Sequence, residues 1–196
     1  MSVALDICNS ALIKLGVTPI SDLDEDTKEA RLCRIQYPII RNATLRSAPW
    51  GFATRRKLLT PVDPMPLEFI DGGEFVFLQP VDCVKVWKLW GQPNVRFRVE
   101  GRYIIADDSS INLYYVSKAT PEDNYDDMFS ETVANRLAAD LCYALVGSTT
   151  LKQGLEATAD NWVREARSYN SQEGTPDNFG FDQFLGARTG GRAFYD

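Results

Sequence analysis

The apolar residues of the chain change their periodicity twice along its length. Residues 3–15 carry apolar side chains at helical spacing, after Ser2 and before Gly16, and this pattern predicts a short capped helix. Residues 30–47 carry a second stripe of the same period, which predicts a longer amphipathic helix.

The start and the middle of this second helix contain two further signals. Asp26 and Glu29 stand three residues apart, which is the spacing of a capping box. Pro38 lies inside the helix and lacks a backbone N–H, so we expect a kink or a break near Gln36.

From Phe52 onward the period shortens to two, the period of a β-strand. Turns rich in proline and glycine separate short alternating segments, and Glu100 with Gly101 stands at hairpin spacing. The connections are too short for crossover helices, so we expect an antiparallel sheet, either open or curled towards a barrel. The expected strands are residues 52–59, 75–78, 83–90, 95–99, 103–106 and 111–116.

The helical period returns after residue 119. Residues 120–123, with proline in the first turn, predict a helix start, and an apolar stripe follows over residues 129–145. Thr150 and Gln153 then have capping-box spacing before a last helix. The stripe expected on that helix is Leu151, Leu155, Thr158, Trp162, Ala166 and Tyr169.

This order of elements predicts an α+β fold, in which the N- and C-terminal helices form a bundle and an antiparallel β domain is inserted between them. The bundle would comprise residues 1–50 and 119–175, the β domain residues 51–118, and an extended tail residues 176–196. The apolar residues of the tail follow neither the helical nor the strand period and lie among several glycines. They are Phe179, Phe181, Phe184, Leu185, Phe194 and Tyr195.

Composition excludes several classes of function. The 196 residues include no histidine, which removes imidazole bases and histidine-ligated metals, and we expect neither a metal nor a cofactor. No apolar run of about 18 residues and no leader-like start occurs, so we expect no membrane span and no secretory signal. The isolated residues Cys8, Cys33, Cys83 and Cys142 should be buried free thiols.

The net charge of −6 is unevenly distributed along the chain. Residues 1–60 carry a net charge of +3, and residues 119–175 carry one of −6. Residues 41–57 contain five basic side chains and no acidic one, namely Arg41, Arg46, Arg55, Arg56 and Lys57. The whole chain should be repelled by nucleic acid and by anionic membranes, but it offers segments of opposite sign.

Five blocks of residues between positions 11 and 176 resemble one known family in their order and spacing. They are Ala11, Leu12, Leu15, Gly16, Pro19, Ile20 and Leu23; Ala30, Tyr37, Arg41, Leu45, Arg46, Pro49, Trp50, Gly51, Phe52 and Ala53; Leu78, Pro80, Asp82, Cys83 and Val86; Val99, Glu100, Gly101, Arg102, Tyr103, Ile104, Leu113 and Tyr115; and Arg136, Leu137, Ala138, Ala139, Leu141, Ala166, Arg167, Gln172, Glu173, Gly174 and Thr175. The succession of blocks resembles the tail tubular protein A family of tailed bacteriophages and prophages, which are head-to-tail adaptor proteins.

This resemblance implies a structural protein of the virion, assembled in the host cytoplasm and located in the neck or tail. Members form a ring of about a dozen copies that docks under the portal and joins it to the tail nozzle or tube. Double-stranded DNA passes through the centre without sequence-specific binding. The family has a helical bundle with a β domain, which agrees with the element order, and we expect no enzymatic activity.

A closed ring of one subunit type needs two different surfaces that meet head to tail. We hypothesise that residues 41–57 of one copy oppose the acidic helices after residue 119 of the next. The alternative is that both segments are solvated faces of one monomer. The aromatic tail is expected to fill pockets on an adjacent subunit or on the portal, or else to pack on its own bundle.

Residues 41–57 also admit a second function, as a contact to DNA phosphates. Trp50, Phe52, Trp87 and Trp90 offer rings on which bases can stack, although aromatic residues near strands more often form a core or a subunit interface. A conduit that held phosphates strongly would retard DNA, so we favour the adaptor.

Carboxylates provide the only candidates for catalysis. A glycoside hydrolase needs two of them across a cleft, and the sequence offers Glu100 with Asp107 or Asp108, and Asp126 with Asp127. Adjacent acids point in different directions, and acids in turns or first helical turns serve as caps, so we disfavour this activity.

Two other ligand classes are also disfavoured. The acidic run at residues 22–29 lacks the central glycine and the spacing of a calcium loop. No glycine-rich phosphate loop follows a strand, so nucleotide binding is not expected.

Overall fold

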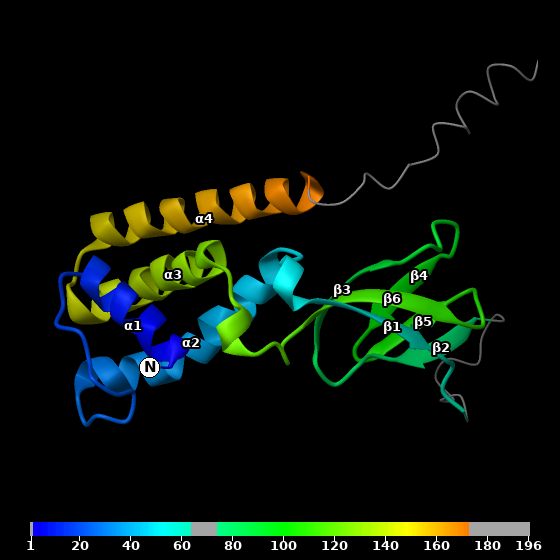
Figure 1. Cartoon of the computed structure of the whole chain (residues 1–196), viewed down its shortest axis with the longest axis horizontal. Helices are drawn as coiled ribbons and strands as arrows, with labels where there is room; N and C mark the ends of the chain where they lie inside the picture. The colour runs from blue at the N-terminus through cyan, green and yellow to red at the C-terminus, as the bar shows by residue number, and fades with distance from the viewer. Residues whose placement is uncertain (1, 64–73, 173–196) are drawn as a thin grey trace, which may run out of the picture.

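The computed structural model describes residues 2–63 and 74–172 of the chain (Figure 1). Within these ranges the α-helices are α1 (Val3–Lys14), α2 (Lys28–Ser47), α3 (Asp127–Leu145) and α4 (Thr149–Gln172). The strands are β1 (Thr54–Leu59), β2 (Phe75–Leu78), β3 (Cys83–Leu89), β4 (Phe97–Glu100), β5 (Tyr103–Ala106) and β6 (Ile111–Ser117). Short 3-10 helices precede β1 and α3, at η1 (Gly51–Ala53) and η3 (Glu122–Asn124).

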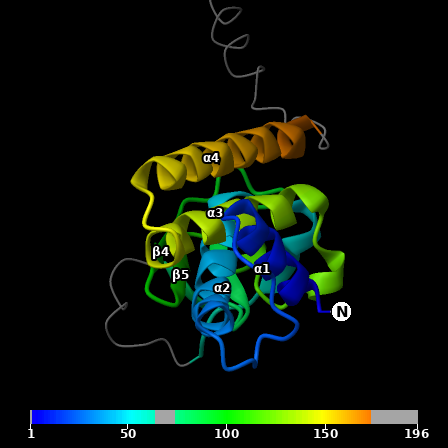
Figure 2. The same cartoon turned by 90° about the vertical axis from the view of Figure 1, so that its left-hand side faces the viewer.

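The helices and the strands occupy opposite ends of the molecule (Figure 1). The helices from the two parts of the chain pack together, with α3 at the centre, α4 on one side of it, and α1 and α2 on the other (Figure 2). The whole strand region is inserted between α2 and α3. This arrangement confirms the predicted α+β class, a bundle of terminal helices with an inserted antiparallel β domain.

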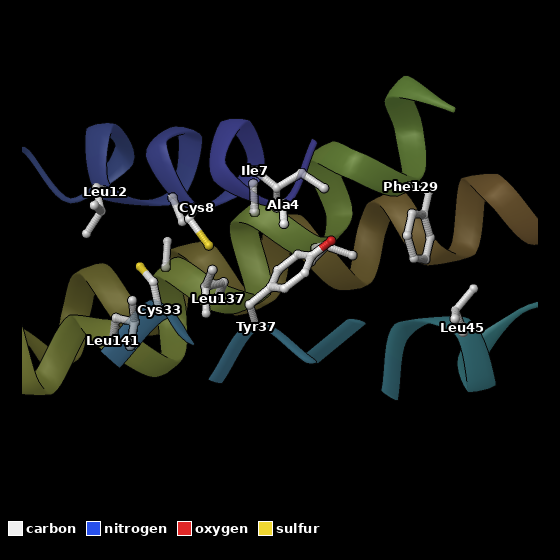
Figure 3. Close-up of a cluster of buried hydrophobic side chains, with 14 of the residues drawn as sticks. Ala4, Ile7, Cys8, Leu12, Cys33, Tyr37, Leu45, Phe129, Leu137 and Leu141 are labelled. Carbon is white, nitrogen blue, oxygen red and sulfur yellow. The ribbon is translucent and has the colours of Figure 1, made fainter. Parts of the chain in front are cut away.

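One apolar core fills the space between α1, α2 and α3 (Figure 3). The helical spacing of their apolar residues puts one stripe from each helix into it, and Leu12, Tyr37 and Leu137 are all buried there. Ten of the 19 residues of α3 are buried, because neighbouring helices cover this helix on several sides.

An aromatic cluster closes this core where the chain leaves α2. Trp50 is 1% exposed, its ring meets Phe129 edge to face at 5.1 Å, and its Nε1 donates to the Thr44 carbonyl at 2.9 Å. Phe52 and Tyr125 pack on Phe129 at 5.1 and 4.7 Å between ring centroids. Trp50 and Phe52, considered above as rings for base stacking, therefore belong to the packing of the bundle.

The strands form two antiparallel sheets of three strands each, in the orders β1-β6-β3 and β2-β5-β4. A second apolar core joins the two sheets, and its buried members are Leu59, Phe77, Leu89, Ile104, Ala106, Ile111, Leu113 and Tyr115. The antiparallel pairing is as predicted, but the strands pack as two layers and form neither one sheet nor a barrel.

The start and the middle of α2 differ from the prediction. The cap is Thr27, whose side chain accepts from the Ala30 N–H at 3.2 Å, and not Asp26. The predicted break near Gln36 is absent, since α2 continues through Pro38 without interruption. Pro38 is exposed, so its ring points away from the core, and only its own backbone hydrogen bond is lost.

The later helices also start at other residues than predicted. Residues 120–123 lead into η3, and α3 begins only after Asp126, whose side chain accepts from Phe129 N at 2.5 Å. Ser148, and not Thr150, caps α4 by accepting from Leu151 N at 3.2 Å. Short polar residues at several neighbouring positions can accept the capping hydrogen bond. The packing of the helix determines which of these residues becomes the cap.

The stripe that packs α4 on α3 differs from the predicted one. Thr158 is exposed, whereas Ala159 and Val163 are buried, because steps of four residues continue from Leu155. The predicted members Ala166 and Tyr169 have side chains outside the described part of the chain. Two strands also shift: β1 starts after η1, and β4 covers residues 97–100 in place of 95–99.

The four cysteines agree with the expectation of free thiols. Cys8, Cys33 and Cys142 are buried and Cys83 is half-buried, and none forms a disulfide. Within the described residues, no helix combines the length and the apolar character needed to cross a bilayer.

The aromatic cluster gives a stability prediction. Trp50→Ala leaves a cavity and removes the indole hydrogen bond to the Thr44 carbonyl, so the free energy of unfolding should fall by about 3 to 5 kcal/mol in urea denaturation. Trp90→Ala is the matched control: Trp90 is 36% exposed, and its removal should cost less than about 1.5 kcal/mol. Equal losses in the two variants would contradict the assignment of Trp50 to the core.

Candidate interaction surface

The outer side of the β1-β6-β3 sheet carries basic and aromatic side chains in register. Arg56 on β1 pairs with Tyr114 on β6, and Tyr114 pairs with Lys88 on β3. Directly paired residues project to the same side of a sheet, so these three side chains form a row across it. Trp90, just beyond β3, lies beside the row, and its backbone N–H donates to the Asn112 carbonyl at 2.7 Å.

The cations of this row rest on the aromatic rings. The Arg56 guanidinium carbon lies 3.4 Å from the centroid of Trp90, and Lys88 Nζ lies 4.9 Å from the same ring. The centroid of the Tyr114 ring lies 6.0 Å from the Arg56 guanidinium carbon and 5.7 Å from Lys88 Nζ. The ring centroids of Tyr114 and Trp90 are 5.8 Å apart. Cation–π contacts of this kind hold the charges in place. We call Arg56, Lys88, Trp90 and Tyr114 the basic–aromatic face.

Irregular pairing of β3 extends this face towards the bundle. Lys85 pairs with Val116 and Lys88 with Tyr114, because the register shifts between Val86 and Lys88. Residues 85 and 88 would lie on opposite sides of a regular strand, but the bulge puts both lysines on the outer side. Lys85 Nζ lies 4.1 Å from the ring of Trp87, so the second lysine is also held by an aromatic ring.

The basic–aromatic face also includes exposed apolar surface. Leu58 lies two residues along β1 from Arg56, on the same side of the sheet, and is 63% exposed. Trp90, which is 36% exposed, adds to this apolar surface. Apolar side chains beside fixed cations are typical of protein contact surfaces, since the apolar area binds and the charges set the orientation.

The structure divides the five predicted basic residues into two groups. Arg41 forms an ion pair with Glu122 at 3.1 Å, and Arg46 donates to the Val84 carbonyl at 2.7 Å. Arg55 donates to the Ala119 carbonyl at 3.2 Å. These three bind groups of their own chain at the junction between bundle and β domain.

Arg56 and Lys57 form the second group and are exposed on β1. Arg56 lies on the basic–aromatic face, whereas Lys57 projects from the opposite side of the strand. The bonds across the junction come from Arg41, Arg46 and Arg55 and involve neither Arg56 nor Lys57. The predicted residues of the tail, Phe179, Phe181, Phe184, Leu185, Phe194 and Tyr195, lie outside the described residues.

The Arg41 ion pair belongs to a small network between α2 and η3. The Tyr37 hydroxyl also donates to Glu122, at 3.1 Å, so one carboxylate accepts from two donors. Burial and the Glu122 carboxylate raise the pKa of Tyr37, and the phenol therefore stays protonated as a donor. The basic stretch and the acidic segment after residue 119 thus meet here within one chain.

The carboxylates considered for catalysis have structural partners. Glu100 bonds to Arg98 at 2.7 Å, and Asp107 to Arg96 at 3.3 Å. Asp108 accepts from Gln92 and from Ser110 N, while Asp126 caps α3. The adjacent Asp127 opens the first turn of the same helix.

The acidic run at residues 22–29 is likewise built into local contacts. Asp24 pairs with Arg34 and Asp26 with Arg31, at 3.1 and 2.9 Å. Among the residues that the structure describes, no group of three or more acidic or thiol side chains is arranged to hold a metal ion.

The chain matches no protein-family model and no curated protein at a significant level.

Asp82 anchors the sheet that carries this face. It accepts hydrogen bonds from Ser117 Oγ at 2.5 Å and from the Tyr115 hydroxyl at 3.3 Å, and its backbone carbonyl accepts from Lys118 N. Burial alone would raise the pKa of Asp82, but it is lowered below its usual value by the hydrogen bonds that the carboxylate accepts from Ser117, from its own backbone N–H and from Tyr115, and by the nearby charge of Arg55.

A pH dependence of stability follows from Asp82. A carboxyl whose pKa is lower in the folded state stabilises the protein above its unfolded pKa of about 3.9, and this contribution is lost as the pH falls through the folded pKa. Asp82→Asn should lower the free energy of unfolding by about 1 to 3 kcal/mol at pH 7 and flatten its decline in acid. Urea denaturation at several pH values measures both effects.

The matched control is Asp123→Asn, at an exposed position on η3. This variant should keep the wild-type stability at pH 7 and its acid dependence. An Asp82→Asn protein that declined in acid as steeply as the wild type would show that Asp82 does not contribute.

Proposed function

We propose that this protein is a structural subunit that assembles head to tail into a ring, connecting a bacteriophage portal to the tail. The observation that carries the proposal is the basic–aromatic face at one end of a molecule whose other end is acidic. Residues 51–118 have a net charge of +1, and residues 1–50 with 119–175 one of −6. The resemblance to tail tubular protein A supports the same function.

The charge of the face favours head-to-tail contact over two-fold pairing. In a two-fold dimer, a surface that crosses the axis meets its own copy, so Arg56 and Lys88 would approach the same cations. Like charges facing each other oppose association, whereas the acidic bundle of another copy attracts them. A contact between unlike surfaces repeats around an axis, and it closes into a ring when the rotation permits.

The subunit would act through its geometry. In this proposal it docks on the portal, joins the tail nozzle or tube, and lines part of the channel for double-stranded DNA in the neck of the virion. A dozen copies with a net charge of −6 each would repel DNA, which favours sliding over binding. The proposed role requires neither catalysis nor a cofactor.

Charge reversal tests the surface. Arg56→Glu removes one cation from the face and adds a carboxylate, so ring assembly on the purified portal should weaken by about tenfold or more at low salt. Arg102→Glu is the matched control, with the same change of charge at an exposed position in the turn between β4 and β5 of the other sheet.

Native mass spectrometry and sedimentation, with and without portal, measure the assembly. The wild type and Arg102→Glu should give the same ring, and Arg56→Glu should remain mostly monomeric. A wild-type protein that stays monomeric with portal at all concentrations would contradict the ring. A ring that forms equally well from Arg56→Glu would contradict the role of this face.

DNA binding is a second candidate function, because the contacts of Arg56 and Lys88 with Trp90 combine cations with an exposed ring. Nucleic-acid platforms pair phosphate contacts with base stacking in this way. Filter binding to single- and double-stranded DNA over a range of salt concentrations separates the two candidates. The adaptor predicts only weak binding that salt abolishes, whereas submicromolar binding lost in Trp90→Ala would favour the DNA platform.

A further inference from the structure

Two buried thiols from different helices face each other inside the bundle. Cys8 on α1 and Cys33 on α2 are both 0% exposed, and their sulfur atoms point towards one another across the gap between the helices (Figure 3). Each thiol shifts the pKa of the other, so the two side chains interact. Both are free in this structure.

Small residues lie beside both cysteines in the core. Ala4 and Ala11 flank Cys8 on the buried side of α1, and Ala30 lies one turn before Cys33 on α2; all three belong to the same core. A disulfide has an S–S bond of about 2.05 Å, and helices separated by larger side chains do not bring two cysteines within its reach. Because the two thiols already face each other, an approach of their sulfur atoms would form this bond.

We propose that Cys8 and Cys33 are a site of oxidative modification, which a small peroxide converts into an intramolecular disulfide linking α1 to α2. The two other thiols of the chain are not arranged for this reaction. Cys142 donates to the Ser148 carbonyl at 3.1 Å, within its own end of the bundle. Cys83 lies in the β domain.

The reaction balances with hydrogen peroxide as the oxidant. The thiolate of one cysteine attacks a peroxide oxygen, the O–O bond breaks, and a sulfenic acid and hydroxide result. The sulfur of the second cysteine then attacks the sulfenic sulfur, forming the S–S bond and displacing hydroxide. Overall, two thiols and one peroxide give one disulfide and two waters, and the peroxide takes up the two electrons.

The surroundings of each thiol bear on the charge of its sulfur. The interaction with Cys8 lowers the pKa of Cys33 against the opposing effect of burial, whereas the interaction with Cys33 and burial raise the pKa of Cys8. One thiol of the pair acts as the attacking thiolate, and the other resolves the sulfenic acid. Burial raises the pKa of Cys83 to about 11, with a further contribution from the Asp82 carboxylate, so that thiol stays protonated near neutral pH.

Burial sets the rate of the reaction. Peroxide reaches the pair only when α1 moves away locally, so oxidation should be slow in the folded protein and limited by this opening. The finished link closes a loop from residue 8 to residue 33, which restricts the unfolded chain and stabilises the fold. The disulfide itself does not depend on the proposed function.

Its biological timing does rest on the proposed function. A subunit assembled in the reducing cytoplasm would keep both thiols reduced, and one carried out of the cell in a particle would meet oxidising conditions. The link would then form after assembly. A failure of ring assembly would remove this timing but leave the chemistry of the pair unchanged, so the two proposals fail separately.

The test uses the purified full chain, reduced and then incubated with hydrogen peroxide. Peptide mapping without reduction should identify one peptide pair joined through Cys8 and Cys33, lighter by the mass of two hydrogen atoms. The Tm should rise by about 5 to 10 °C, and dithiothreitol should reverse both changes. Cys33→Ser should abolish the cross-link and the shift, whereas the matched variant Cys142→Ser should retain both.

Several outcomes would overturn the proposal without relying on a variant. In the wild type, peroxide that leaves Cys8 and Cys33 as free thiols, while unfolded chain is oxidised under the same conditions, excludes the pair. Sulfinic acid at Cys8 or Cys33 without a cross-link would also exclude the pair. A cross-link that joins Cys83 or Cys142 would exclude it as well. Cys8→Ser provides a second test if Cys33→Ser fails to fold.

Discussion

The structure depends on the burial of α3, which belongs to the C-terminal part of the chain but packs against helices from both parts. Its neighbours α1 and α2 precede the β domain, so the chain must leave the bundle and return to the same place. The pairing of Thr54 with Val116 meets this requirement, since the strands of exit and return lie side by side. An insertion whose ends meet in one antiparallel pair leaves the helical core intact.

This requirement determines how the basic residues are used. Arg41, Arg46 and Arg55 lie where the chain crosses from bundle to sheet, and each bonds to a group that follows in sequence. A basic stretch that looks continuous in the sequence is therefore divided by the fold: one part holds the junction, and Arg56 faces outward on aromatic rings. These bonds attach the sheet, and the face that it carries, to the bundle.

The periodicity of apolar residues was sufficient to predict the helices, the strands and the insertion, because burial imposes these periods on the sequence. It was not sufficient for features set by single hydrogen bonds or by pairing between distant strands. Thr27 and Ser148 became caps in competition with neighbouring polar residues. The side on which Lys85 and Lys88 lie depends on a bulge against β6, which no local pattern of β3 records. The row from Arg56 to Tyr114 and Lys88 likewise exists only through the register of three strands.

The composition of the basic–aromatic face indicates how it would bind. At physiological ionic strength, exposed charges more than about 8 Å apart are largely screened. The overall attraction between the basic–aromatic face and the acidic bundle of another copy would therefore contribute little affinity by itself. Trp90 and Leu58 supply apolar area that salt does not weaken, and the cations held on Trp90 are already positioned. The apolar side chains would therefore provide most of the binding free energy, while the charges select the orientation and exclude a second basic face. A surface of this kind binds a partner in one orientation better than in the reverse orientation. Assembly with a single polarity requires this property.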